Sequence, residues 1–130
     1  MKINIETIPH SDQRYPTVGD YWDDENGVIQ VRVSDMKDWR YEALVILHEL
    51  IEMFLTKHRG IAEEDISDFD IKFELSRNEQ LVCGEPGDHP KAPYRAEHFF
   101  ATNLERLFSS ELGVNWFEYD RDVDALGIKK

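Results

Sequence analysis

The N-terminal part of the chain alternates hydrophobic and polar residues, which is the pattern of half-buried β-strands. Residues 2–8 alternate isoleucines with polar residues, and residues 18–22 and 28–33 form the two arms of a predicted hairpin. The acidic residues followed by Asn and Gly at 24–27 supply the turn between these arms. The pattern predicts a small antiparallel sheet of about three strands within residues 1–34.

The spacing of the hydrophobic residues becomes helical after the predicted sheet. It predicts helices over residues 37–60, 63–76 and 94–112, with Gly60 and Gly113 suited to end the first and the last. The first helix starts after an N-cap at Ser34 or Asp35 and is apolar on nearly all sides, which is typical of a buried helix. The chain is therefore expected to be an α+β protein, with the sheet followed by three helices.

Two segments are expected to lack regular structure. The Gly- and Pro-rich residues 77–93 are longer than a usual connection and predict a functional or mobile loop. At the C-terminus, the aromatic residues 114–119 are expected to dock on the body, and residues 120–130 to fray. The length fits one domain, residues 1–130. Its parts are an N-terminal sheet, a helical part and a C-terminal tail, at residues 1–34, 35–113 and 114–130.

The charge of the chain restricts its partners. Fifteen Lys and Arg residues against 27 Asp and Glu residues give a net charge of −12, which repels phosphate backbones and anionic membranes. We therefore expect no nucleic-acid binding and no membrane binding. Cys83 is the single cysteine, so any metal site must use histidines and carboxylates. No signal peptide and no apolar run of roughly 18 residues is evident, which predicts a cytoplasmic protein.

The motif HELIE, which begins at His48, lies inside the longest predicted helix. His48 and Glu52 are four residues apart, so both can point at one ion, while Glu49 is turned about 100° away. Imidazole nitrogen and carboxylate oxygen bind divalent metals at similar distances. The alternative explanation is a solvated stripe, because Glu42 and Thr56 share this sector of the helix.

The last predicted helix has an apolar face that is expected to pack in the core. The face comprises Tyr94, Phe100, Ala101, Leu104, Leu107, Phe108 and Leu112. Glu97 lies near its centre, with His98 and Glu105 at its edge. A carboxylate buried there is costly unless it is paired or metal-bound, so Glu97 and His98 are candidate ligands from a second helix. Asp70 is a further candidate. The alternatives are pairing of Glu97 with Arg40, Arg95 or a backbone group, an ordinary histidine at position 98 and a solvated aspartate at position 70.

The HELIE motif, preceded by a predicted hairpin and followed by two helices, resembles the HExxH signature of zincins, with Glu52 in place of the second histidine. The resemblance implies a metal-dependent hydrolase with a zincin-like arrangement and with Glu49 as the general base. We expect His48, Glu52 and His98 to hold one divalent ion, with Glu97 or Asp70 completing or orienting the shell. Zinc is the first candidate, and manganese, iron and magnesium are alternatives.

Two other readings are kept open. The chain also resembles MazG-type nucleotide pyrophosphohydrolases, in which paired acidic residues, here Glu49 with Glu52 and Asp65 with Asp68, hold magnesium against a triphosphate. The segments YEALVILHELIE and GDHPKAPYRAEHFFATNLER are similar to small proteins of phages and mobile elements. That resemblance implies no biochemical activity. The alternative to an enzyme is a non-enzymatic interaction module, as a monomer or a homodimer, whose acidic surface binds a basic protein partner or mimics nucleic acid.

Overall fold

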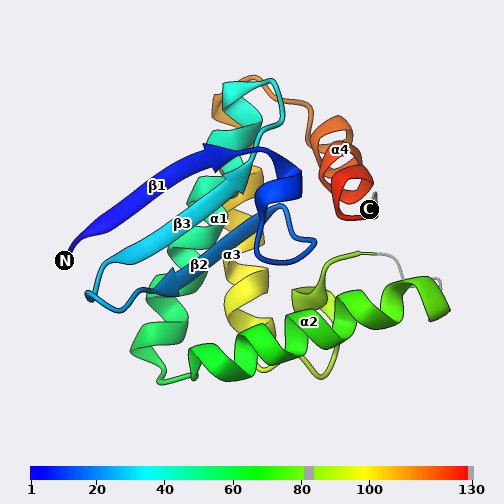
Figure 1. Ribbon diagram of the computed structural model, residues 1–130. Coiled ribbons are helices and arrows are strands. Elements are labelled where there is room, and N and C mark those ends of the chain that lie inside the picture. The colour runs from blue at the N-terminus through cyan, green and yellow to red at the C-terminus, as the bar shows by residue number, and fades with distance from the viewer. Residues whose placement is uncertain (81–83, 129–130) are drawn as a thin grey trace.

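A three-stranded sheet is followed by four helices in the part of the chain that the structure describes, which confirms the predicted α+β class (Figure 1). The computed structural model describes residues 1–80 and 84–128. The strands are β1 (Ile3–Ile8), β2 (Gly19–Asp23) and β3 (Ile29–Ser34). The helices are α1 (Trp39–His58), α2 (Glu63–Gln80), α3 (Arg95–Glu111) and α4 (Trp116–Ile128), with short 3₁₀ turns η1 (His10–Asp12) and η2 (Pro86–Asp88).

The sheet is mixed, so the prediction of an antiparallel sheet is wrong for β1. The strand order is β1-β3-β2, with β1 parallel and β2 antiparallel to β3. Val31 in the central strand is the partner of Ile5 on one side and of Tyr21 on the other. The alternating pattern could not reveal the direction of β1, because side chains alternate with the same period in parallel and antiparallel strands.

Helix α1 packs its apolar side on one face of the sheet. Its N-cap is Asp38, whose side chain accepts a hydrogen bond from the backbone N–H of Arg40, and not Ser34 or Asp35 as predicted. Leu44, Val45 and Met53 from the helix share the main core with residues of β3. This packing sets the rotation of α1, because the helix has to turn these three side chains toward the sheet.

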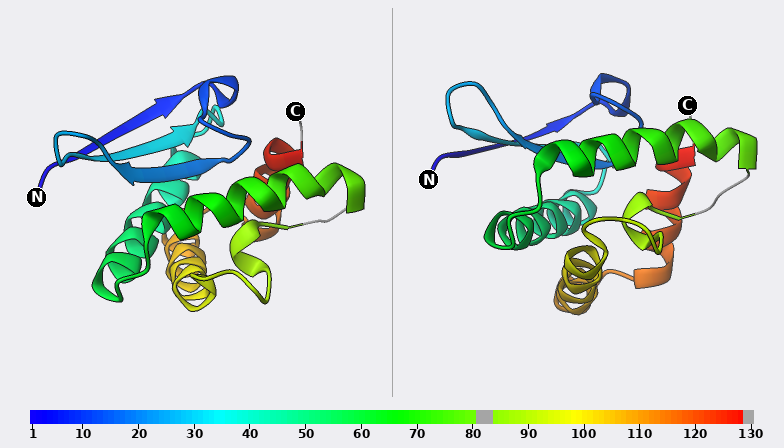
Figure 2. Two further views of the ribbon diagram at one scale, coloured as in Figure 1. Left: turned by 60° about the horizontal axis from the view of Figure 1, so that its bottom comes forward. Right: turned by 90° about the horizontal axis from the view of Figure 1, so that it is seen from below.

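Helices α2 and α3 complete the walls of a cavity beside α1. Helix α3 packs along α1 on the side remote from the sheet, and α2 passes beside the edge strand β2 (Figures 1 and 2). The turn η2 contacts both α2 and α3. It lies inside the predicted loop over residues 77–93, of which residues 81–83, including Cys83, lie outside the described residues. Helix α2 also runs to Gln80, past the predicted end at residue 76.

Helix α3 turns its polar side inward, so the prediction that its apolar face forms core is largely wrong. Its buried residues are Glu97, His98, Ala101, Glu105 and Ser109. Phe100 and Leu107, placed in the core from the sequence, are 51% and 69% exposed. The reason is that the inward side of α3 borders the cavity, where polar side chains find partners, while the outward side meets no other described element.

The C-terminal tail is helical, which corrects the predictions of three helices and of a tail that frays after residue 119. Helix α4 continues to Ile128, and residues 129–130 lie outside the described part of the chain. Tyr119 and Val123 are buried in the main core, with Tyr119 only 1% exposed. Within residues 1–80 and 84–128, no helix combines the length and the apolar character that a membrane crossing requires.

Candidate metal centre

Three predicted ligands meet between α1 and α3. His48 and Glu52 lie one turn apart on α1, His98 comes from α3, and all three side chains are buried. His48 Nε2 lies 3.0 Å from Glu52 Oε2, and His98 Nδ1 lies 3.1 Å from each of these atoms. The structure thus brings together two imidazoles and one carboxylate that are close enough to hold one metal ion.

The triangle of atoms has the size that a divalent ion requires. Metal bonds of about 2.0–2.2 Å place neighbouring ligand atoms about 3.4 Å apart at tetrahedral angles and about 3.0 Å apart at right angles. The observed separations of 3.0 and 3.1 Å match the right-angle value and are a few tenths of an ångström shorter than the tetrahedral one. Two histidines and one carboxylate also leave coordination positions for water or substrate. The residues therefore fit a divalent cation in size and in chemistry.

Each ligand is held from behind by a separate partner. His48 Nδ1 lies 2.8 Å from Glu105 Oε1, and His98 Nε2 lies 3.1 Å from Asp88 Oδ1. A neutral histidine that donates from its outer nitrogen to a carboxylate presents a lone pair on its inner nitrogen, as metal-binding histidines do. The remaining Glu52 oxygen, Oε1, accepts a hydrogen bond of 3.3 Å from the Tyr21 hydroxyl. These contacts orient all three inner atoms toward one point.

The contact between His48 and Glu105 extends to α4. The Tyr119 hydroxyl donates a hydrogen bond to Glu105 Oε2, so a chain of three buried residues anchors the imidazole. Sequence reasoning did not assign a role to Glu105 or Tyr119. Glu105 lies seven residues after His98, two helical turns along the same face, and this spacing could have identified it. No local pattern points to Tyr119.

The pKa shifts at the centre show that it favours positive charge. Burial acts to lower the pKa of His48, but hydrogen bonds with Glu105 and Glu52 outweigh burial and raise it well above its ordinary value. Burial also acts to lower the pKa of His98, but hydrogen bonds with Asp88 and Glu52 outweigh burial and raise it. For Glu52, burial acts to raise the pKa, but the two histidines lower it to about 2. Electrostatics that hold protons here also suit a metal cation.

Glu49, the predicted general base, lines the same cavity as the three ligands. Its half-buried carboxylate accepts no hydrogen bond from the described residues. Burial and the nearby charge of Glu52 raise its pKa well above the ordinary value. A Cβ atom at Gly19 would lie 2.5 Å from Glu49 Oε1, so glycine makes room for the carboxylate. Glu49 therefore lies beside the three predicted ligands with a carboxyl group whose pKa is raised.

Asp70 and Glu97 are buried but do not belong to the triangle. Asp70 lines the cavity, where it accepts hydrogen bonds from the hydroxyls of Tyr15, at 3.1 Å, and Tyr94. Burial raises the pKa of Asp70 to about 7. Glu97 forms an ion pair with Arg59 at the end of α1. Glu97 thus pairs with an arginine, as the alternative predicted, but the partner is Arg59 and not Arg40 or Arg95. The roles of Asp70 and Glu97 as ligands stay predictions.

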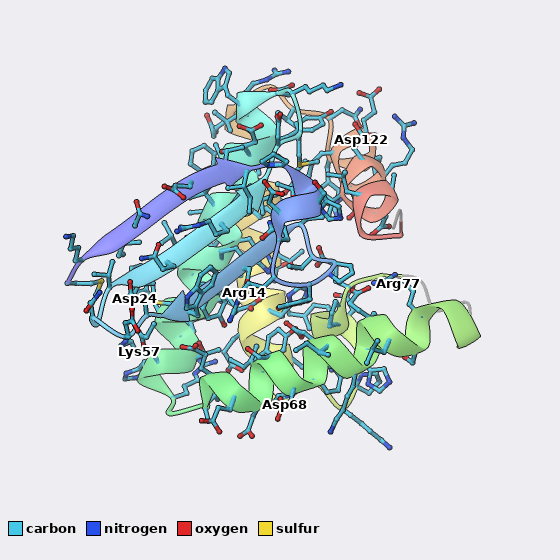
Figure 3. The ribbon with its side chains drawn as sticks, viewed as in Figure 1. Arg14, Asp24, Lys57, Asp68, Arg77 and Asp122 are labelled. Carbon is cyan, nitrogen blue, oxygen red and sulfur yellow. The ribbon has the colours of Figure 1, made fainter. Side chains whose placement is uncertain are left out.

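The other acidic residues near the centre or proposed from the sequence do not belong to the triangle of ligand atoms. Asp65 and Asp68 are exposed, and neither lines the cavity. Figure 3 shows Asp68 pointing outward from α2. Glu85 and Asp88 also lie near His98, and their ligand atoms are within reach of a shared ion. Since both of them contact His98 Nε2, the ring nitrogen that faces away from Glu52, we treat them as outer partners of this histidine.

Comparison with known proteins reveals no relative: no family model, curated protein or solved structure matches the chain. The resemblances to zincins, to MazG-type enzymes and to phage proteins therefore stay predictions from the sequence. A fold class by itself does not specify an activity, so the function has to be argued from the residues of the centre.

Proposed function

We propose that the protein is a divalent-metal-dependent hydrolase in which His48, Glu52 and His98 bind the ion and Glu49 is the general base. The observation that carries the proposal is the triangle of inner atoms, 3.0–3.1 Å apart, with both outer imidazole nitrogens bonded to carboxylates. Zinc is the first candidate metal, and iron and manganese also suit two nitrogens and one oxygen.

The buried charges support a cation at this place. Glu52 and Glu105 are both buried, and two carboxylates in such an environment are costly without compensating positive charge. His48 lies between them, 3.0 Å from one and 2.8 Å from the other. A bound divalent ion beside Glu52 provides this compensation and takes the place of protons on the inner nitrogens of the histidines.

Glu49 carries the proton transfer in the proposed reaction. A bound divalent ion supplies Lewis acidity and lowers the pKa of water. Glu49 lines the same cavity as the ligands. The raised pKa of its carboxyl group makes the carboxylate a stronger base toward water. Because no described residue donates a hydrogen bond to it, its oxygens remain free to accept a proton from water and to return it to a leaving group.

Metal analysis tests the binding part of the proposal. Protein purified without added metal is expected to contain about one equivalent of a divalent metal by mass spectrometry. His48→Ala and His98→Ala should each lose it, whereas His58→Ala, at an exposed position, should retain it. A metal content that is negligible in both wild type and His48→Ala would refute the proposal.

Glu49→Gln tests the hydrolytic part. The substitution keeps the shape of the side chain, so the metal content should equal that of wild type. Hydrolysis of ester, peptide and phosphoester substrates should fall by about 10²-fold or more, because the base is lost. A variant that keeps both its metal and its full activity would exclude Glu49 as the base. Bound metal without turnover of any of these substrates would reduce the proposal to a structural metal site.

A further inference from the structure

Helix α3 exposes a row of large apolar side chains on the side opposite the metal centre. We define the outer row as Phe99, Phe100, Leu107 and Phe108, which are between 40% and 69% exposed. Figure 2 shows α3 on the side of α1 remote from the sheet, where no described element covers it. We propose that the protein is a homodimer in which the outer row packs against the outer row of a second copy.

The size of the apolar surface fits such a contact. Taking about 200 Å² for a large side chain, the outer row exposes roughly 400 Å² of apolar surface. A stable homodimer interface buries about 800 Å² on each partner, of which about 65%, or roughly 500 Å², is apolar. The exposed side chains thus supply most of the apolar area that a dimer needs.

The charge of the surface favours contact between two copies of this acidic chain. Among residues 95–110, nine positions are exposed and none of them is acidic, although the chain carries 27 Asp and Glu residues. The two glutamates in this span, Glu97 and Glu105, are buried. Two molecules of charge −12 repel each other unless they meet where carboxylates are absent. The outer row is such a surface, and the exposed Arg95 and Arg106 flank it.

The order of residues along the row also suits a twofold contact. Asn103, which is exposed, lies midway between the Phe99–Phe100 pair and the Leu107–Phe108 pair. An antiparallel contact of two α3 helices centred there places each pair opposite the other pair of the second copy, as an isologous interface requires. An asparagine side chain both donates and accepts hydrogen bonds, so Asn103 can bond to its own copy across the axis.

The mass in solution tests the proposal. At about 50 µM, wild type should sediment at twice the chain mass of 15.3 kDa. Leu107→Glu places a carboxylate from each copy within the apolar contact and should halve the observed mass. The matched control is Leu75→Glu on α2, since Leu75 has the same exposed fraction of 69% but lies on another helix. This variant should remain a dimer.

Circular dichroism and metal content separate assembly from folding. Leu107 is mostly exposed and lies outside the metal centre, so Leu107→Glu should keep the wild-type helix content and the wild-type metal content. A wild-type chain that sediments as a monomer would overturn the proposal, as would a dimer that survives Leu107→Glu. Neither result depends on whether the protein is a hydrolase.

Discussion

At the scale of single residues, two glycines position the side chains of the centre. A Cβ atom at Gly87 would collide with the ring of His98, and one at Gly19 would collide with the carboxylate of Glu49. Neither glycine requires a left-handed backbone, so the reason for glycine is the space that the neighbouring side chain occupies. Substitution at these positions therefore probes the placement of His98 and Glu49 without removing either group.

Gly87→Ala is expected to weaken metal binding. The added methyl group has to push the His98 ring or the η2 turn away, and misplacing a ligand should lower the metal affinity by about 10-fold or more in a competitive titration with a chelator. Gly127→Ala is the control, because a Cβ atom there meets nothing within 4 Å. Metal affinity equal to wild type in Gly87→Ala would show that the position of the His98 ring is unimportant for the ion.

At the scale of secondary-structure elements, each helix around the centre supplies a different part of it. Helix α1 provides two proposed ligands and the proposed base, and α3 provides the third proposed ligand. Helix α4 supports the arrangement through the hydrogen bond from Tyr119 to Glu105. The inward side of α3 is polar for this reason. An amphipathic helix usually turns its apolar side to the core, but here the ligand His98 and its neighbours occupy the buried side.

Tyr119→Phe tests the support that α4 gives to the centre. The substitution removes the hydroxyl that bonds Glu105 and leaves a buried carboxylate oxygen without this donor. We expect the free energy of unfolding to fall by about 1–3 kcal/mol in a denaturant titration. We also expect the metal affinity to fall by about 10- to 100-fold, since Glu105 orients His48.

Tyr41→Phe is the matched control for this change. The two rings pack edge to face with centroids 5.2 Å apart, but no described residue forms a hydrogen bond with the Tyr41 hydroxyl. The control should bind metal as wild type does. If Tyr119→Phe matched it in both stability and metal affinity, the hydrogen bond to Glu105 would have no role in the centre.

At the scale of the whole molecule, the excess of acidic residues is unevenly distributed. Several carboxylates are buried around the cavity, whereas the exposed side of α3 has none between residues 95 and 110. Helix α3 therefore separates a charged interior site from an apolar outer surface. The same helix carries a ligand of the proposed metal centre on one side and the proposed dimer contact on the other. The buried acidic residues should make the stability of the whole molecule depend on pH.

Asp70 should make the protein less stable as the pH rises. Its pKa is about 7 in the folded protein and 3.8 in a model compound, so between these values the folded state binds the extra proton. The contribution of this group to the free energy of unfolding is therefore fully present below pH 4. It falls by up to roughly 4 kcal/mol as the pH rises from 4 to 7. Denaturant titrations of metal-free protein at several pH values measure this loss.

The Asp70→Asn variant should flatten this part of the pH profile, because the amide does not ionise. Asp68→Asn on the same helix is the control, since Asp68 is exposed and should leave the slope unchanged. Equal slopes for wild type and Asp70→Asn between pH 4 and 7 would contradict burial as the cause of the raised pKa.

The sequence by itself determined the three strands, the helices α1 to α3 and the proximity of groups close along the chain, but not helix α4. Alternating residues indicated β2 and β3, and the spacing of His48 and Glu52 placed them on one face of α1. The helical pattern also singled out Glu97 and His98 as buried polar residues, which they are, although the apolar face expected to surround them is largely exposed. These inferences succeed because strand and helix periods are set by local backbone geometry, which each segment carries in its own residues.

Only the tertiary structure decided the direction of β1, the buried side of α3 and the chain from His48 through Glu105 to Tyr119. Each depends on which segments distant in sequence pack together, and a local period does not encode that choice. A helix with one polar and one apolar side can bury either one. The polar side of α3 is buried because the partners of its side chains lie on α1, α4 and η2, and the apolar side is left outside.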